Sequence, residues 1–240
     1  MNSFGRIFRV HIFGESHGEC VGLTIDGCPA GLPLSVDDFT TDIERRKPGA
    51  LGTTPRKEDD IPQIKTGLFN GKTTGAPITI IFENKNTRSS DYEKLRAVPR
   101  PGHADFVASK KFGGNEDYRG SGHFSGRLTV CLVAAGVIAK RLLLTSTKEG
   151  GIIVQSYISE IGGEKDPDKG LQKAFDAKDS VGGIVECKVS GLPVGLGEPF
   201  VDSAESLISH AVFAIPAVRG VEFGTGFAAA RMFGSDHNDS

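Results

Sequence analysis

Residues 7–25 read IFRVHIFGESHGECVGLTI, two apolar runs on either side of a polar centre. The runs Ile7–Phe13 and Val21–Ile25 are rich in residues that favour β structure, so they predict two strands joined by a turn. Glycines bracket His17 in that turn, and glycine lets the backbone turn tightly and approach a ligand closely. A histidine placed there is positioned without being enclosed, and imidazole exchanges protons near neutral pH. His17 is therefore interpreted either as a proton-transfer group or as an ordinary solvated histidine.

The composition is that of a globular protein. The chain has 240 residues, of which 38% are hydrophobic and 24% charged, and its formal net charge is -2. This near-neutral balance gives no reason to expect nucleic acid or an anionic membrane as a partner. The length suits one large domain or two small ones.

The cysteines and the apolar stretches indicate where the protein resides. Four cysteines, Cys20, Cys28, Cys131 and Cys187, form no C-x-x-C pair, so we expect no metal site. The N-terminal residues lack the apolar core of a signal peptide. The longest apolar stretch, residues 128–144, is interrupted by two basic residues and is too short to span a bilayer. These features predict a cytoplasmic protein with free thiols.

Further elements follow from local signals. A helix is predicted to begin after the N-cap Ser35 and to end at Arg46, because a Pro-Gly pair follows. The stretches Gln63–Phe69 and Ala76–Glu83 predict the two strands of a hairpin closed by an Asn-Gly turn.

From residue 104 onward helices and strands alternate. Helices are predicted at 104–111, 127–144, 168–177 and 204–213, and strands at 152–158, 183–189 and 218–223. In the first of these helices, Phe106 and Val107 are expected to face the interior. The helix from Arg127 is apolar nearly all round, which predicts burial between layers. The glycine-rich loop 113–126 precedes it and is expected to bring ligand groups to its N-terminus, where anions are favoured.

A second histidine and several arginines complete the candidate site. His103 lies in a turn much like that of His17, and arginines occur near both turns, at Arg46, Arg56, Arg100, Arg119 and Arg127. The guanidinium group keeps its charge and binds phosphate or carboxylate with two hydrogen bonds. No nucleophile elbow, Walker loop or G-x-G-x-x-G follows a predicted strand. The pattern predicts an enzyme that acts on a small, highly anionic substrate with histidine acids.

Several segments also match the signatures of a known family. In chain order they are 14–18, 26–31, 45–49, 53–57, 70–78, 100–105, 117–120, 125–127, 220–224 and 234–235. Together they resemble the chorismate synthases, and the resemblance covers the whole chain. It implies an α+β fold, a β–α–β sandwich with helices between two antiparallel sheets, as a single domain over residues 1–240. The family is usually assembled as a homotetramer.

The resemblance also implies a reaction. Chorismate synthases are lyases of the shikimate pathway of aromatic amino-acid biosynthesis. They eliminate phosphate in a 1,4-fashion from 5-enolpyruvylshikimate 3-phosphate to give chorismate. Reduced FMN is required without net redox change, the flavin lending an electron transiently, and NADP is associated with the family.

Site residues follow from the matching positions. His17 would protonate the leaving phosphate, and His103 the reduced flavin. The anionic substrate is expected to be bound by Arg46, Arg56, Arg119 and Arg127. The FMN positions of the family correspond to His123, Phe124, Ser125 and, more weakly, Ala217.

This chain departs from the family pattern in several places. His123 and Phe124 stand where many members have Arg and Ser, and Gly52 replaces an arginine. The family continues past residue 240 with further FMN-binding segments and a catalytic aspartate, so we expect a sandwich that is incomplete at the C-terminus. The 240-residue chain, taken literally, is then expected to bind FMN weakly or not at all and to make no chorismate. The rival hypotheses are a catalytically inactive fragment or anion-binding module of the same fold, and a phosphate lyase without flavin.

Overall fold

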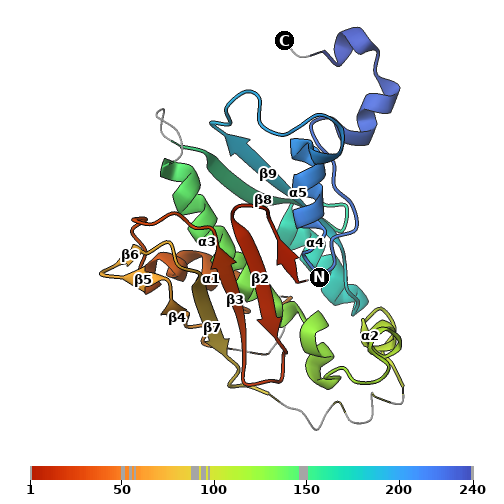
Figure 1. Ribbon diagram of the computed structural model, residues 1–240. Coiled ribbons are helices and arrows are strands. Elements are labelled where there is room, and N and C mark those ends of the chain that lie inside the picture. The colour runs from red at the N-terminus through yellow and green to blue at the C-terminus, as the bar shows by residue number, and fades with distance from the viewer. Residues whose placement is uncertain are drawn as a thin grey trace. The chain divides into compact units, whose positions relative to one another are not determined.

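Figure 1 shows the computed structural model, which describes residues 2–49, 52–53, 56, 58–87, 92, 96, 98–145 and 151–238. Three residues of the motif 53–57 therefore lie outside the described part of the chain. The chain divides into two compact units, Met1–Leu192 and Pro193–Ser240, and each is described by itself.

The first unit is built on an antiparallel five-stranded sheet with the strand order β1-β2-β3-β7-β4. Its strands are β1 (Ser3–Phe4), β2 (Arg9–Gly14), β3 (Cys20–Asp26), β4 (Gln63–Thr66) and β7 (Ile78–Glu83). The strands β2 and β3 are the pair predicted around His17, and Phe13 lies opposite Gly22. A Cβ on Gly22 would lie 2.5 Å from the Phe13 ring, so glycine leaves room for that ring on the sheet.

The predicted hairpin after residue 63 is more complex than the sequence indicated. β4 pairs with β7. The Asn-Gly turn instead closes a separate ribbon of β5 (Leu68–Phe69) and β6 (Lys72–Thr73). Gly67 separates the two pairings: it has a φ of 81°, and a Cβ there would lie 2.8 Å from the backbone of Ile78. A left-handed residue at this position ends β4 and redirects the chain.

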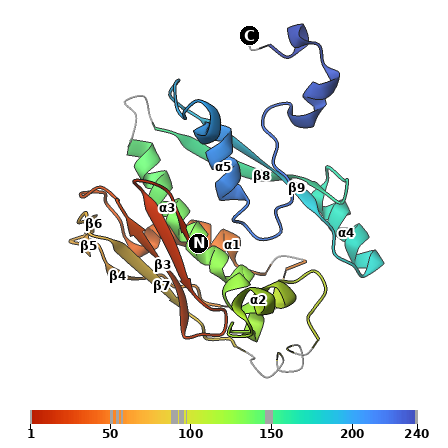
Figure 2. The same cartoon turned by 45° about the vertical axis from the view of Figure 1, so that its right-hand side comes forward.

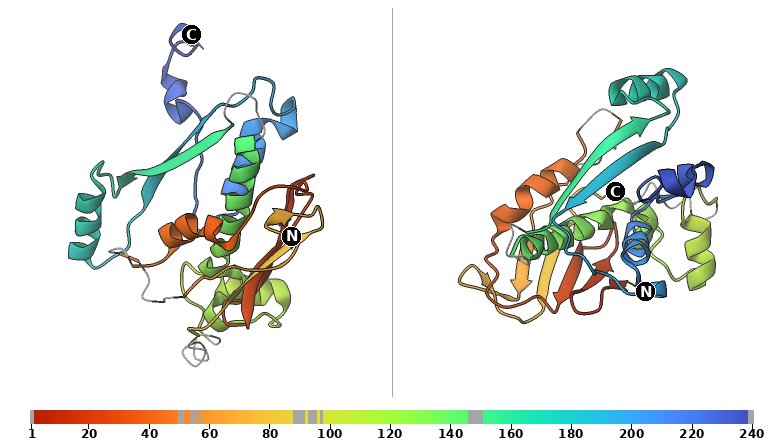
Figure 3. Two further views of the ribbon diagram at one scale, coloured as in Figure 1. Left: turned by 90° about the vertical axis from the view of Figure 1, so that its left-hand side faces the viewer. Right: turned by 90° about the horizontal axis from the view of Figure 1, so that it is seen from above.

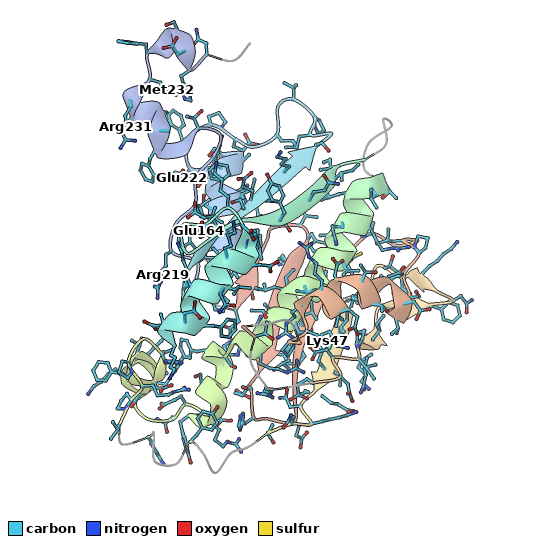
Figure 4. All side chains as sticks on the ribbon, turned by 180° about the vertical axis from the view of Figure 1, so that it is seen from behind. Lys47, Glu164, Arg219, Glu222, Arg231 and Met232 are labelled. Atoms are coloured by element: carbon cyan, nitrogen blue, oxygen red, sulfur yellow. The ribbon has the colours of Figure 1, made fainter. Side chains whose placement is uncertain are left out.

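The first helix begins and ends where the sequence predicted. A 3₁₀ turn, Val36–Phe39, leads into α1 (Thr40–Arg46). The backbone N–H of Ser35 donates to the Asp38 carboxylate at 2.7 Å, which is one half of a capping box. The backbone N–H of Lys47 (Figure 4) closes the last turn by donating to the carbonyl of Ile43 at 3.0 Å.

The helix α3 (Thr129–Thr145) forms the centre of the core. Its buried side chains are Val130, Cys131, Ala134, Ala135, Val137 and Ile138. They pack with fully buried residues of β3 and β7, among them Leu23, Ile80 and Phe82. The span Arg119–Thr145 is long and apolar enough to pass a composition test for a membrane helix, a test that core helices also pass. Burial on several sides, as predicted, explains why α3 has so little polar surface.

A second antiparallel layer lies on the other side of the helices. It consists of β8 (Ile153–Ile161) and β9 (Gly183–Ser190), joined through α4 (Pro167–Ala177). Figures 2 and 3 show α1 and α3 between this ribbon and the five-stranded sheet. Lys173 on α4 pairs with Glu164 (Figure 4) and so ties the helix to the end of β8. The predicted α+β class and β–α–β layering are therefore confirmed.

The prediction that Phe106 and Val107 face the interior is wrong. The helix α2 (Asp105–Phe112) forms near the predicted place, but the two side chains are 57% and 58% exposed. The residue that α2 buries is Ala108. The helix therefore packs against the protein through this small side chain, and its aromatic residues Phe106 and Phe112 line a neighbouring cavity.

The second unit is mostly irregular. It contains α5 (Ala204–Val212), whose N-cap Ser203 accepts a hydrogen bond from the Ser206 backbone at 3.2 Å, as predicted. The predicted strand over residues 218–223 is wrong, since none of these residues pairs with a strand in the described part of this unit. The side chain of Glu222 (Figure 4) instead packs over Gly226, where a Cβ would collide with its carboxylate.

Candidate active site

The turn between β2 and β3 carries His17 toward the interior. His17 is 9% exposed and Ser16 is fully buried, so the expectation of an open, solvated turn is wrong. The reason is the glycine-rich loop, which lies directly on the imidazole. A Cβ on Gly120 would come within 2.6 Å of His17 Nε2, and the Ser16 N–H donates to the Gly122 carbonyl at 3.0 Å.

The loop over His17 has an unusual backbone. Gly120, Ser121 and Gly122 have φ values of 58°, 65° and 51°. Left-handed geometry costs glycine little, but it strains a serine. The hydroxyl of Ser121 accepts a hydrogen bond from Arg100 Nη2 at 2.8 Å, which helps to hold this conformation.

His103 lies in the turn that precedes α2. Its Nδ1 is 3.0 Å from the carbonyl oxygen of Pro101. Because a carbonyl can only accept, Nδ1 carries a hydrogen, and Nε2 is the atom at which the neutral ring takes up a proton. The turn is fixed by Arg100, which donates to both carboxylate oxygens of Asp105 at 2.8 Å. These hydrogen bonds hold the pKa of Asp105 below its usual range.

Tyr92 lies between the two histidine turns. Its ring meets the His17 ring edge-to-face, with centroids 5.1 Å apart, and the Arg100 guanidinium carbon is 5.5 Å from its centroid. The sequence analysis missed Tyr92, because it lies in a polar stretch without periodicity. The sequence marks Tyr92 only as one aromatic residue in a stretch of charged and polar residues. The two histidine turns thus share one aromatic neighbour.

Two of the predicted arginines converge on a carboxylate that the sequence analysis did not single out. Arg46 Nη1 donates to Asp60 Oδ2 at 2.7 Å, and Arg127 Nη1 donates to Asp60 Oδ1. The Asp60 side chain is 1% exposed, and the backbone there is left-handed with a φ of 51°. Arg46 Nε also donates to Thr129 Oγ1 at 3.1 Å, at the start of α3. Burial lowers the pKa of Arg46, although the charge of Asp60 opposes this shift.

The other two predicted arginines lie elsewhere. Arg56 Nη1 donates to Ser16 Oγ at 2.7 Å and Nη2 to the Ser16 carbonyl at 3.1 Å, while Glu58 accepts from its Nη2 at 2.7 Å. Arg119 donates to both carboxylate oxygens of Asp117 at 2.8 Å, which lowers the pKa of Asp117. The structure therefore brings Arg46 and Arg127 together at Asp60, binds Arg56 to Ser16 next to His17, and pairs Arg119 with Asp117.

A large cavity opens beside β2, α2 and the glycine-rich loop. Its volume is about 940 Å³, and its aromatic lining residues are Phe13, Tyr92, Phe106, Phe112, Tyr118 and Phe124. The Phe112 and Phe124 ring centroids are 6.1 Å apart. His123 also lines it, and its Nδ1 donates to the Gly14 carbonyl at 2.8 Å, which ties the loop to the end of β2. A cavity of this size and lining suits a planar aromatic ligand.

Of the remaining predicted cofactor residues, Ser125 belongs to the same unit as this cavity but does not line it. Ser125 Oγ accepts from the Arg127 N–H at 3.3 Å and so caps the turn before α3. Ala217 belongs to the second unit, where its φ of 71° is rare for a residue other than glycine.

In the part of the chain that the structure describes, the thiols and the metal-binding side chains form no further site. All four cysteines are free, and burial raises the pKa of Cys131 to about 12. Within the described ranges, no three His, Cys, Asp or Glu side chains gather as they would around a metal ion.

Two histidines in neighbouring turns, clustered arginines and an aromatic cavity on a β–α–β sandwich are typical of an enzyme that handles a small anion. The sequence pattern of the family described as Chorismate synthase matches residues 8–240. The chain is 68% identical over 240 residues to chorismate synthase of Chitinophaga pinensis, covering all of this chain and 71% of that protein. It is 48% identical over 266 residues to that of Dehalococcoides mccartyi, covering 99% of this chain and 72% of that protein.

A solved structure titled "Crystal Structure of Chorismate Synthase" has the same fold. The TM-score is 0.74 at 26% identity, with 98% of this chain and 73% of that chain covered. The chain belongs to the chorismate synthase family.

Proposed function

We propose that this chain, against the expectation that its 240 residues alone make no chorismate, converts 5-enolpyruvylshikimate 3-phosphate to chorismate by 1,4-elimination of phosphate, with reduced FMN as the cofactor. Its family is one of lyases in aromatic amino-acid biosynthesis. The observation that supports the proposal most is the meeting of the two histidine turns at Tyr92, since both turns belong to the motifs of the family. An anion-binding module without catalytic activity would have no need of two histidines fixed in this way.

The histidines suit the proton movements of the reaction. The C–O bond to phosphate breaks, the phosphate leaves with the electron pair, and one proton leaves a ring carbon. We assign the protonation of the leaving phosphate to His17, which is nearly buried and covered by the loop at Gly120. His103 can exchange a second proton at Nε2, next to the cavity residues Ala104 and Asp105.

The cavity fits the proposed cofactor. An aromatic lining and a volume of about 940 Å³ suit the flat ring system of a flavin. Phe124 and Phe112 would pack against that ring system, and His123, whose Nδ1 is bonded to Gly14, would use Nε2 for a polar group of the ligand. When bound, reduced FMN would supply the transient electron that eases phosphate departure.

The arginines divide into two proposed roles. Arg119 is the most accessible of the four, with 38% of its side chain exposed, and its neighbour Tyr118 lines the cavity. It is proposed to contact substrate anions directly. Arg46 and Arg127 are held by Asp60, and Arg56 by Ser16. They are proposed to contribute positive charge near His17 that attracts the substrate anion.

An anaerobic assay of phosphate release tests the proposal. With reduced FMN we expect one phosphate and one chorismate for each substrate consumed, and with oxidised FMN we expect neither. Phosphate release that is independent of flavin would favour a flavin-free lyase. Binding of the substrate without turnover under any flavin condition would favour an anion-binding module.

A further inference from the structure

Asn84 follows directly after β7 and reaches the turn that carries His17. Its side-chain amide nitrogen donates to the carbonyl of Glu15 at 3.0 Å and to the carbonyl of Gly18 at 2.9 Å. Its backbone N–H donates to the carbonyl of Glu19 at 3.0 Å. One residue therefore binds both ends of the four-residue turn and the first residue beyond it.

The orientation of this amide follows from its partners. Arg127 Nε, which can only donate, lies 2.9 Å from Asn84 Oδ1. The carbonyls of Glu15 and Gly18 can only accept, so the NH₂ group must face the turn. Both hydrogens and the oxygen of the amide are used. No other side chain of similar size offers two donors on one side and an acceptor on the other in this arrangement, apart from the same group in a longer glutamine.

Asn84 is itself held by the buried charges. Arg127 is 4% exposed and donates to Asp60 and, through Nη2, to the Glu83 carbonyl at 3.2 Å. The guanidinium is thus locked on three sides, and it fixes Asn84 Oδ1 in turn. Hydrogen bonds to charged groups of this kind are stronger than neutral ones. Asn84 therefore fixes both ends of the turn that carries His17, and Gly120 covers the His17 ring.

We propose that Asn84 is a positioning residue for His17: its amide fixes the turn so that the imidazole meets the leaving phosphate. This inference rests on the proposed role of His17. Asn84 itself does not touch the reacting atoms. Displacement of a catalytic group by about 1 Å can lower a rate by about 100-fold, so loss of the amide should be visible in kcat.

The variant Asn84→Asp separates this role from support of Arg127. Asp keeps the volume and an acceptor for Arg127 Nε but replaces the NH₂ group by an oxygen that repels the carbonyls of Glu15 and Gly18. We expect kcat to fall by about 10- to 100-fold with little change in KM. The matched control is Asn70→Asp, the same change in the exposed turn between β5 and β6, where Asp is well tolerated.

Two measurements distinguish positioning from general damage. In a His17→Ala background, Asn84→Asp should lower kcat by less than about three-fold further, because its effect passes through His17. In imidazole NMR spectra, Asn84→Asp should shift the signals of His17 and leave those of His237 in place. Unchanged kcat in a folded Asn84→Asp variant would overturn the proposal. So would a full additional loss of kcat in the His17→Ala background.

The proposed function can fail separately. If His17→Ala retained wild-type turnover, the role of His17 would be wrong. The NMR comparison would then still decide whether Asn84 fixes the turn, since it needs no activity. Unshifted His17 signals would contradict the inference that the Asn84 amide fixes this turn.

Discussion

Asp60 is the residue that organises the arginine cluster. Sequence patterns identified Arg46 and Arg127 as anion-binding candidates, but the structure shows that a buried carboxylate already lies between them. Two guanidinium groups this close repel each other unless a negative charge intervenes. A buried ion pair is weak evidence of net stabilisation, yet removal of one partner leaves a charge without compensation.

The change Asp60→Asn tests this arrangement. It keeps the shape of the side chain and removes the charge, so we expect the free energy of unfolding to fall by about 3–5 kcal/mol. The matched control is Asp59→Asn, because Asp59 is 65% exposed and forms an exposed ion pair with Lys85 at 3.2 Å. That change should cost less than about 1 kcal/mol. Urea unfolding measures both free energies. Equal losses for the two variants would show that the buried charge of Asp60 stabilises the fold no more than an exposed one.

The acid stability of the protein depends on two carboxyls held by arginines. Hydrogen bonds from Arg100 and Arg119 lower the pKa of Asp105 and Asp117. A lowered pKa in the folded state gives stability that is complete above the unfolded value of about 3.9 and is lost as the pH falls through the folded value.

We therefore expect the free energy of unfolding to decrease as the pH falls below about 4, and Asp105→Asn to make this decrease shallower. Thermal unfolding between neutral and acid pH measures the slope. The exposed Asp37 provides the control variant Asp37→Asn, which should leave the slope unchanged. A slope that Asp105→Asn does not alter would mean that the pair with Arg100 contributes nothing to acid stability.

At the scale of elements, the parts that the sequence predicted are those with strong local signals. The strands around His17, the cap of Ser35 and the apolar helix α3 were all recognisable from residue patterns. The end of β4 at Gly67 was not recognisable, because it depends on how closely the backbone of Ile78 approaches this glycine. The exposure of Phe106 depends on a cavity formed by distant segments, which periodicity does not reveal.

The helix α3 offers a direct test of the core. Ile138 is fully buried between the layers, so Ile138→Ala should lower the free energy of unfolding by about 2–5 kcal/mol. Leu144 on the same helix is 53% exposed, and Leu144→Ala should cost less than about 1 kcal/mol. Denaturant unfolding compares the two. A small effect at Ile138 would mean that the two layers do not pack on α3 as described.

At the scale of the whole molecule, residue patterns predicted an alternation of helices and strands with one helix buried between layers, and the family resemblance added the two antiparallel sheets. The ribbon of β8 and β9 exposes apolar side chains, including Ile158, Ile184 and Val185. Exposed apolar strands favour contact with another polypeptide surface. This agrees with the expectation that the protein associates into an oligomer, while the homotetramer, the cytoplasmic location and the small anionic partner stay predictions. Light scattering of the purified protein would give the number of subunits.

The site as a whole could be predicted only in part. The sequence pointed to His17, His103 and the arginines, because glycine turns and cation clusters are visible as patterns. It missed Tyr92, Asp60 and Asn84, whose roles arise from contacts between segments far apart in the chain. A lone tyrosine, aspartate or asparagine in a polar stretch has no local signal of its own.

The central claim is that two fixed histidines catalyse the elimination of phosphate. The most direct test is kcat for anaerobic phosphate release with reduced FMN, measured for His17→Ala and His103→Ala beside the control His237→Ala, a change at an exposed histidine of the second unit. We predict that each of the first two lowers kcat by about 100- to 10,000-fold and that the control does not. Turnover within a few-fold of wild type in both His17→Ala and His103→Ala would contradict the account.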